Sequence, residues 1–140
     1  MEELLELRKC ILNQNYTEAL LIVDELEEMS KDDKIAKIKS YLIILLIHLI
    51  KQEAEKRNTR SWQNSILNSI EGIQETNKRR RSKGYYLNDE ELTEAIESVF
   101  ARAVRTASEE AFEGIYSDRE LLAKFDRDKV KSKTLELLKV

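Results

Sequence analysis

Residues 41–50 read YLIILLIHLI, a run of apolar side chains that is interrupted only by His48. A helix on the surface of a protein needs a polar face toward water, and this run has none. It is also too short to cross a bilayer, which takes about 18 to 20 residues. We therefore expect residues 41–50 to be buried on every side, as the axis of a core built from other helices.

The composition predicts that the rest of the chain is helical as well. The 140 residues include no Pro and three Gly, and they are rich in residues that favour helices, such as Leu, Glu, Lys and Ala. A chain of this length usually forms one domain with a real hydrophobic core. We predict an all-α, single-domain helical bundle over residues 1–140, with a long, fully buried central helix at residues 31–57 and about five to seven helices in total.

Capping pairs indicate where helices begin. In such a pair a short polar side chain accepts from a backbone amide, and an acid three residues later reaches back. Four pairs fit: Asn15 with Glu18, Ser30 with Asp33, Asn88 with Glu91, and Ser117 with Glu120. They predict one helix from 15 to 29, the central helix from 30, and later helices from 88 and 117. Amphipathic patterns add helices at residues 2–12, 61–76 and 129–138.

Charge is distributed unevenly along the chain. Residues 51–86 hold nine Lys or Arg against four Asp or Glu, whereas residues 1–50 hold six against ten and residues 87–140 nine against thirteen. Such a pattern can steer an anionic partner or attract a second copy of the chain. Within the basic part, residues 77–87 are interpreted as a linker between helices.

The cellular setting is predicted from what the sequence lacks. The single thiol, Cys10, cannot form an intramolecular disulfide, and the start MEELLELRK has neither the cationic region nor the apolar stretch of a signal peptide. No segment is apolar for long enough to span a bilayer. We expect a cytoplasmic protein that does not associate with a membrane.

Three segments in the first half of the chain resemble the signature of a known family. DELEEMS at 24–30, LIHLIK at 46–51 and RSWQNSI at 60–66 are similar to the domain of unknown function 29 family. The resemblance implies a mostly cyanobacterial, all-helical protein. The family has no assigned activity, so the resemblance implies no catalytic or binding role for any residue of this chain.

His48 is the first candidate for chemistry, because imidazole titrates near neutral pH and binds metal ions. The neighbouring residues Ile44, Leu45, Ile47 and Leu49 are apolar, which excludes the Glu-x-x-His and His-Glu-x-x-His metal motifs. We favour a packed, hydrogen-bonded structural histidine over a site histidine. The sequence predicts no metal ligands and no cofactor.

The segment RNTRSW at 57–62 is the second candidate. A helix that begins there with Arg57 and Arg60 beside its N-terminus could hold a phosphate or carboxylate, with Ser61 as the cap. The alternative, which we favour, is that Ser61 only caps the helix, Trp62 packs in the core and the arginines pair with acids of the second helix.

The third candidate is the basic run KRRRSK and the two tyrosines that follow it. Cations beside stacking aromatic rings can bind the backbone and bases of a nucleic acid. The residues that would do so are Lys78, Arg79, Arg80, Arg81, Lys83, Tyr85 and Tyr86. However, the chain as a whole is acidic, with a pI of about 5.4, and a charged run between helices is more often a solvated linker.

These observations rank the possible functions. A non-catalytic protein-interaction or regulatory module comes first. Its partner would be another protein or a second copy of the chain, and one form of it is antitoxin-like. Nucleic-acid binding through residues 78–86 is the alternative, and an enzyme or a metal site near His48 comes third. The sequence contains no Gly-rich phosphate loop and no Gly-x-Ser-x-Gly motif, so enzymatic activity is the least favoured class.

Overall fold

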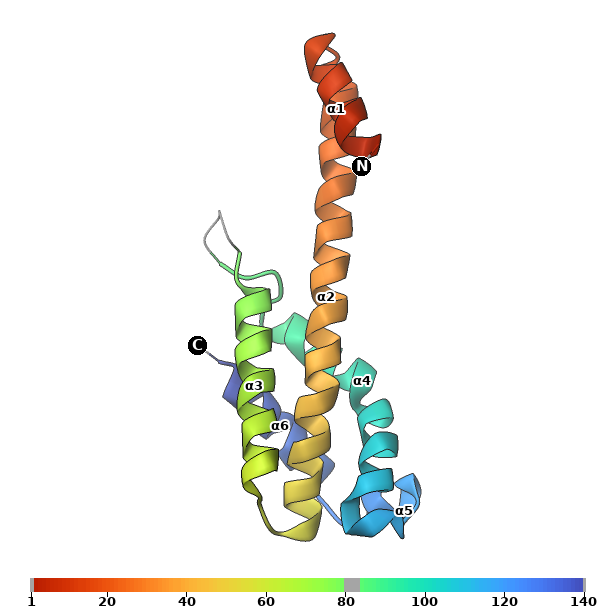
Figure 1. Cartoon of the computed structure of the whole chain (residues 1–140), viewed down its shortest axis with the longest axis vertical. Coiled ribbons are helices and arrows are strands. Elements are labelled where there is room, and N and C mark those ends of the chain that lie inside the picture. The colour runs from red at the N-terminus through yellow and green to blue at the C-terminus, as the bar shows by residue number, and fades with distance from the viewer. Residues whose placement is uncertain (1, 80–83, 140) are drawn as a thin grey trace. The chain divides into compact units, whose positions relative to one another are not determined.

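The computed structural model describes residues 2–79 and 84–139, and within them the fold is all-α, as predicted (Figure 1). The elements are α1 (Glu2–Leu12), α2 (Tyr16–Glu55), α3 (Arg60–Asn77), α4 (Asp89–Glu110), the 3-10 turn η1 (Ala111–Gly114), α5 (Asp118–Leu122) and α6 (Arg127–Leu138). The chain forms two compact units, residues 1–35 and 36–140, and α2 contributes to both. Among the described residues, no helix has the length and apolar character needed to cross a membrane.

α2 is one helix of 40 residues, so the predicted helix end at Met29 and helix start at Ser30 are wrong. A capping side chain marks a boundary only where the backbone leaves the helical conformation. No Gly or Pro occurs between residues 1 and 71 to cause this. Ser30 therefore lies inside α2, where serine costs only a few tenths of a kcal/mol.

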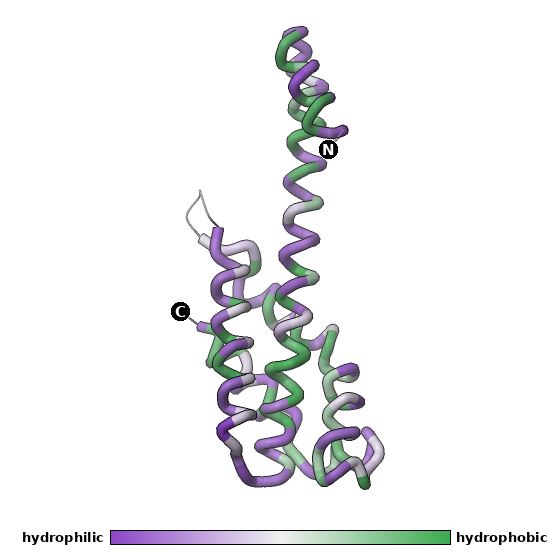
Figure 2. Tube along the Cα trace, in the orientation of Figure 1, coloured by the Kyte–Doolittle hydropathy of each residue, from purple (hydrophilic) through white to green (hydrophobic). Residues whose placement is uncertain are grey.

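The C-terminal half of α2 forms the core of the second unit. Ile38, Leu42, Leu45, Leu46 and Ile50 are 0% exposed, and Figure 2 shows this part of α2 as a continuous hydrophobic stretch. The burial is nevertheless incomplete along one side of the helix.

Full burial of the central helix is not confirmed. Ile44 is 43% exposed, and Tyr41, Ile43 and His48 are half-buried. Exposed residues 36, 37, 40 and 44 recur at helical spacing. The helices around α2 therefore leave one strip of it open to solvent.

Two contacts show that α3 packs antiparallel to α2. The Gly72 backbone lies against the ring of Tyr41, and the Trp62 ring lies beside Lys51. Residue numbers rise along one helix as they fall along the other, as expected for helices joined by a short link. In the same unit α6 packs on α3 and α4.

The cap chemistry of the later helices follows the prediction. Asn88 with Glu91 and Ser117 with Glu120 each form the complete reciprocal capping box. At the start of α2, the Glu18 amide donates to Asn15 Oδ1 over 3.4 Å. Local side-chain chemistry therefore decides where these three helices begin.

In the N-terminal unit, α1 folds back beside the start of α2 (Figure 1). The turn between them uses Gln14 in the left-handed region, at φ 59°. Ala19 and Ile22 are buried in this unit, and Leu7, Cys10 and Leu26 are half-buried. Most of the other apolar side chains of this unit are exposed.

Gly72 provides a test of the α2–α3 packing. A Cβ atom added at Gly72 would lie 2.5 Å from Cζ of Tyr41, so Gly72→Ala should not show the gain of about 1 kcal/mol that alanine usually brings to a helix interior. In a Tyr41→Ala background the same substitution should stabilise the protein by about that amount. Chemical denaturation of the four proteins measures this coupling. Equal effects of Gly72→Ala in both backgrounds would contradict the contact.

Candidate functional site

The N-terminal unit leaves an unusual amount of apolar surface in solvent. α1 buries none of its described residues, and in residues 16–35 of α2 only Ala19 and Ile22 are buried. Of thirteen exposed large hydrophobic residues in the described part of the chain, nine belong to this unit: Leu4, Leu5, Ile11, Leu12, Tyr16, Leu20, Leu21, Val23 and Met29. We call these nine residues the N-terminal apolar surface. So many exposed apolar side chains in one small unit can mark an interaction site.

The same unit is strongly acidic. Residues 1–35 hold four Lys or Arg against ten Asp or Glu, whereas residues 36–140 hold twenty against seventeen. The first unit therefore carries six net negative charges and the second three net positive charges. A surface that combines acids with exposed apolar side chains favours a partner that is itself cationic and amphipathic.

In the second unit a polar cluster surrounds Lys51, whose side chain is only 8% exposed. Lysine is seldom buried without a partner, and Lys51 has two. Its Nζ lies 3.0 Å from Oε1 of Glu110 and 4.7 Å from the centroid of the Trp62 ring. A carboxylate and an aromatic face both attract a cation that has lost its water. The cluster thus connects α2 to α3 and α4.

His48 lies one turn before Lys51 and is half-buried. Its Nδ1 atom is buried and has no hydrogen-bond partner within the described residues, so the expected hydrogen bond is not made at this nitrogen. Burial, and secondarily the charge of Lys51, lowers the pKa of His48, while Glu110 acts in the opposite direction. The imidazole is therefore neutral at pH 7.

A metal site at His48 receives no support from its surroundings. In residues 2–79 and 84–139 no group of three or more His, Cys, Asp or Glu side chains is arranged to hold a metal ion. The nearby Lys51 ammonium also opposes the approach of a cation.

The predicted cap of α3 at Ser61 is wrong. The cap of α3 is Thr59, whose Oγ1 accepts from the Trp62 amide over 3.1 Å, so Ser61 lies in the first turn and is not the cap. Threonine caps nearly as well as serine, and this register brings Trp62 into the core, where it is 9% exposed. Thr59 and Ser61 can both cap a helix, and the sequence alone does not decide between them.

Arg57 and Arg60 have different surroundings. Arg57 Nε donates to Oε1 of Glu55 over 3.2 Å, and its Cζ lies 4.6 Å from the centroid of the Trp62 ring. Arg60 and Ser61 are exposed on α3. Arg57 thus already has two partners, whereas Arg60 and Ser61 face solvent, and an anion site that combines the three residues stays a prediction.

Hydrogen bonds join the two ends of the segment between α3 and α4. Asn77 donates to the Leu87 carbonyl over 3.1 Å and accepts from the Leu87 amide over 2.8 Å. The Tyr86 amide donates to the Asn77 carbonyl, and Lys78 and Tyr85 form an isolated antiparallel bridge. The loop that carries the basic run is thus held at both ends.

Of the predicted nucleic-acid-binding residues, four can be placed. Lys78 and Arg79 are exposed, Tyr85 is 43% exposed, and the ring of Tyr86 already has the Arg79 guanidinium 5.4 Å from its centroid. Arg80, Arg81 and Lys83 lie outside the described residues. One tyrosine of the pair therefore remains open for stacking.

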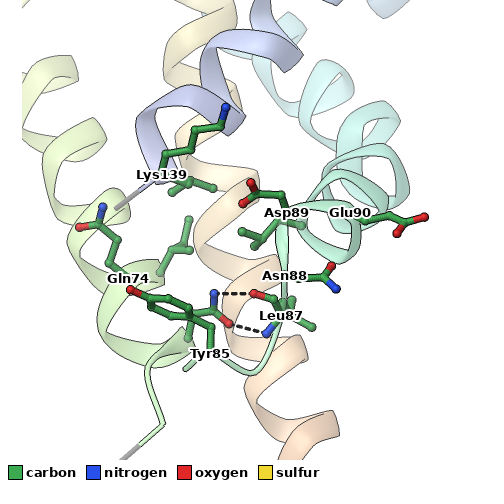
Figure 3. A pocket seen from close by; sticks show the side chains of 11 residues that line it. Gln74, Tyr85, Leu87, Asn88, Asp89, Glu90 and Lys139 are labelled. Carbon is green, nitrogen blue, oxygen red and sulfur yellow. Dashed lines mark hydrogen bonds between the residues drawn. The ribbon is translucent and has the colours of Figure 1, made fainter. Parts of the chain in front are cut away.

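A cavity of about 810 Å³ lies beside this loop (Figure 3). Ile73, Leu87, Leu92 and Leu138 supply apolar lining, and Gln74, Tyr85, Asn88, Asp89, Glu90 and Lys139 supply polar groups. The size suits a small molecule, but the mixture of acids, a lysine and amides selects no single class of ligand. Sequence reasoning missed this cavity because α3, α4, α6 and the loop each contribute only a few residues.

The chain belongs to the family of the domain of unknown function DUF29, whose family model matches residues 5–137. The match includes both compact units, so they are parts of one family domain. No match was found among curated proteins or among solved structures.

The buried ion pair predicts an asymmetry between its two partners. Glu110→Gln leaves the buried Lys51 ammonium without a counter-charge and should lower the free energy of unfolding by about 1–3 kcal/mol. Lys51→Met places an apolar side chain of similar length beside Trp62 and leaves a carboxylate that is 44% exposed and can be hydrated, so its effect should be smaller. Urea denaturation of both variants measures the difference. A Glu110→Gln variant as stable as the wild type would contradict the role of the pair.

Proposed function

We propose that this DUF29 protein is a non-catalytic protein-interaction module that binds its partner on the N-terminal apolar surface. The observation that carries the proposal is that α1 buries none of its described residues although it contains exposed Leu4, Leu5, Ile11 and Leu12. Side chains that contribute little to the protein's own core gain most of their stabilisation when a partner covers them, at roughly 25 cal/mol per Å².

The partner that fits this surface is a cationic amphipathic helix of another protein. Exposed apolar residues of α1 and α2 can receive the apolar face of such a helix, as in other helix-in-groove complexes. The ten acids of residues 1–35 then face the basic side of the partner, which speeds association and selects against acidic competitors.

A second copy of the chain fits less well. A symmetric dimer through this surface would bring together two units that each carry six net negative charges. A head-to-tail contact would need apolar surface on residues 36–140, where the exposed large hydrophobic residues in the described part are Ile44, Leu67, Tyr85 and Ile115. These four come from separate elements and offer no continuous apolar face.

This chemistry suits a regulatory protein that covers a basic partner, including an antitoxin-like neutraliser. We place that role in the cytoplasm, since Cys10 is the single cysteine of the sequence. The proposal assigns the protein no substrate and no cofactor.

The proposal can be tested with a synthetic helical peptide of leucine and lysine whose leucines form one face. Calorimetric titration at physiological salt should show saturable binding to the wild type. Leu20→Ser combined with Leu21→Ser should weaken binding at least about tenfold, because both side chains lie on the N-terminal apolar surface. Leu67→Ser is the matched control, since Leu67 is an exposed leucine of α3, and it should bind like the wild type.

Two further peptides separate this proposal from simpler explanations. A peptide of the same composition without a continuous leucine face should not bind; equal binding would reduce the interaction to charge alone and refute the proposed surface. Wild-type self-association that is lost in the Leu20 and Leu21 variant would show that a second copy is the partner, also against the proposal. A peptide with glutamate in place of lysine should bind much more weakly.

A further inference from the structure

A second cavity, of about 460 Å³, lies in the second unit where the C-terminal end of α2 and the link to α3 meet α6. Leu49 and Val130 are its buried apolar residues. The rest of the lining is polar, with four cationic side chains, one carboxylate and three amides: Lys56, Arg57, Lys129, Lys133, Glu53, Gln52, Asn58 and Gln63. We call it the basic cavity.

Glu53 neutralises only part of this positive charge. Its Oε1 atom accepts from Lys56 Nζ over 2.9 Å and from Lys129 Nζ over 3.0 Å, so one carboxylate serves two ammonium groups. These hydrogen bonds, that of Lys56 first, lower the pKa of Glu53. The carboxylate therefore stays ionised, and the pair of lysines keeps one net positive charge.

The remaining two cations leave a second net charge. Arg57 is balanced by Glu55, which its Nε contacts over 3.2 Å. Lys133 is exposed, and no carboxylate of the described residues forms an ion pair with it. With Glu55 included, the basic cavity has four cations, two carboxylates and thus two net positive charges.

The amides of the basic cavity add hydrogen-bond donors. Gln52 Nε2 donates to Asn58 Oδ1 over 2.7 Å, and Asn58 Nδ2 donates to Gln63 Oε1 over 3.3 Å. The carbonyl oxygens of Asn58 and Gln63 are therefore already used as acceptors. The side-chain amide NH2 group of Gln63 is therefore left to donate a hydrogen bond to a ligand.

We propose that the basic cavity binds a small, doubly charged oxyanion, of the chemistry shared by phosphate esters and dicarboxylates. Positive charge together with free donors selects an anion with several oxygen acceptors, and the volume lies within the range of small-molecule sites. The site is distinct from the anion site predicted around Arg57, Arg60 and Ser61. Arg57 lines the basic cavity, Arg60 and Ser61 do not, and the other cations come from Lys56 and the α6 lysines.

The single tryptophan of the chain supplies a direct readout. Trp62 lies 4.6 Å from the Arg57 guanidinium, so an anion that engages Arg57 changes the environment of the one indole in the protein. Glycerol 3-phosphate, a phosphate monoester, titrated into the wild type with sodium chloride keeping ionic strength constant, should produce a saturable change in tryptophan fluorescence. Lys133→Ala should weaken the apparent affinity at least about tenfold.

Lys37→Ala is the matched control, because Lys37 is an exposed lysine of α2 that does not line the basic cavity. It should respond like the wild type. Succinate in place of glycerol 3-phosphate distinguishes the two sources of the anion, because both carry two charges: tighter binding of glycerol 3-phosphate indicates a phosphate ester, and tighter binding of succinate a dicarboxylate. Equal affinity in Lys133→Ala and wild type would overturn the proposal. So would the absence of any saturable response in both the fluorescence and the amide chemical shifts of residues 129–133.

Discussion

The structure depends on burying the apolar half of α2. Leu42, Leu45, Leu46 and Ile50 are completely removed from solvent, and each buried side chain of this size contributes about 1.5–3 kcal/mol. A helix that carries so much apolar surface must be largely covered, and α3, α4 and α6 contact this half of α2 while the strip that includes Ile44 stays exposed. Lys51 follows directly after this stretch, and its buried charge is held by Glu110 and Trp62. The polar contacts thus sit where the apolar core ends.

The N-terminal half of α2, in contrast, leaves its apolar side chains exposed. Leu20 and Leu21, near the start of α2, are 63% and 55% exposed, whereas Leu49 and Ile50, near its end, are 3% and 0% exposed. The charge changes in parallel, because the acids of residues 1–35 are not matched by nearby cations in the sequence. One half of α2 therefore stabilises the fold, and the other half leaves apolar side chains in solvent. This division supports the proposed interaction function, and the basic cavity offers a second, chemically separate site.

Sequence reasoning succeeded where the signals are local. The helical content, the reciprocal caps at Asn88 and Ser117 and the burial of Leu42 and Leu45 all follow from residues within a few positions of each other. It failed at Ser30, because a capping residue can equally sit inside a helix when nothing ends that helix. It also overestimated the burial around Ile44, since the sequence does not reveal how many helices will surround α2.

The candidate sites were harder to predict because they are assembled from distant parts of the chain. The Lys51–Glu110 pair joins residues 59 positions apart, and the Glu53–Lys129 pair residues 76 apart. Arg57 was recognised as a possible anion ligand, but nothing in the sequence placed the α6 lysines beside it. The apolar residues of α1 likewise follow an ordinary amphipathic pattern, and the sequence does not show that they stay exposed to solvent. The central claim, that one half of α2 is buried in the core and the other half is exposed to solvent, can be tested by amide hydrogen exchange along this helix. The account predicts that amides of residues 42–50 exchange only by near-global unfolding, and that those of residues 17–33 exchange several orders of magnitude faster. Uniform protection along α2, or weaker protection at 42–50, would contradict it.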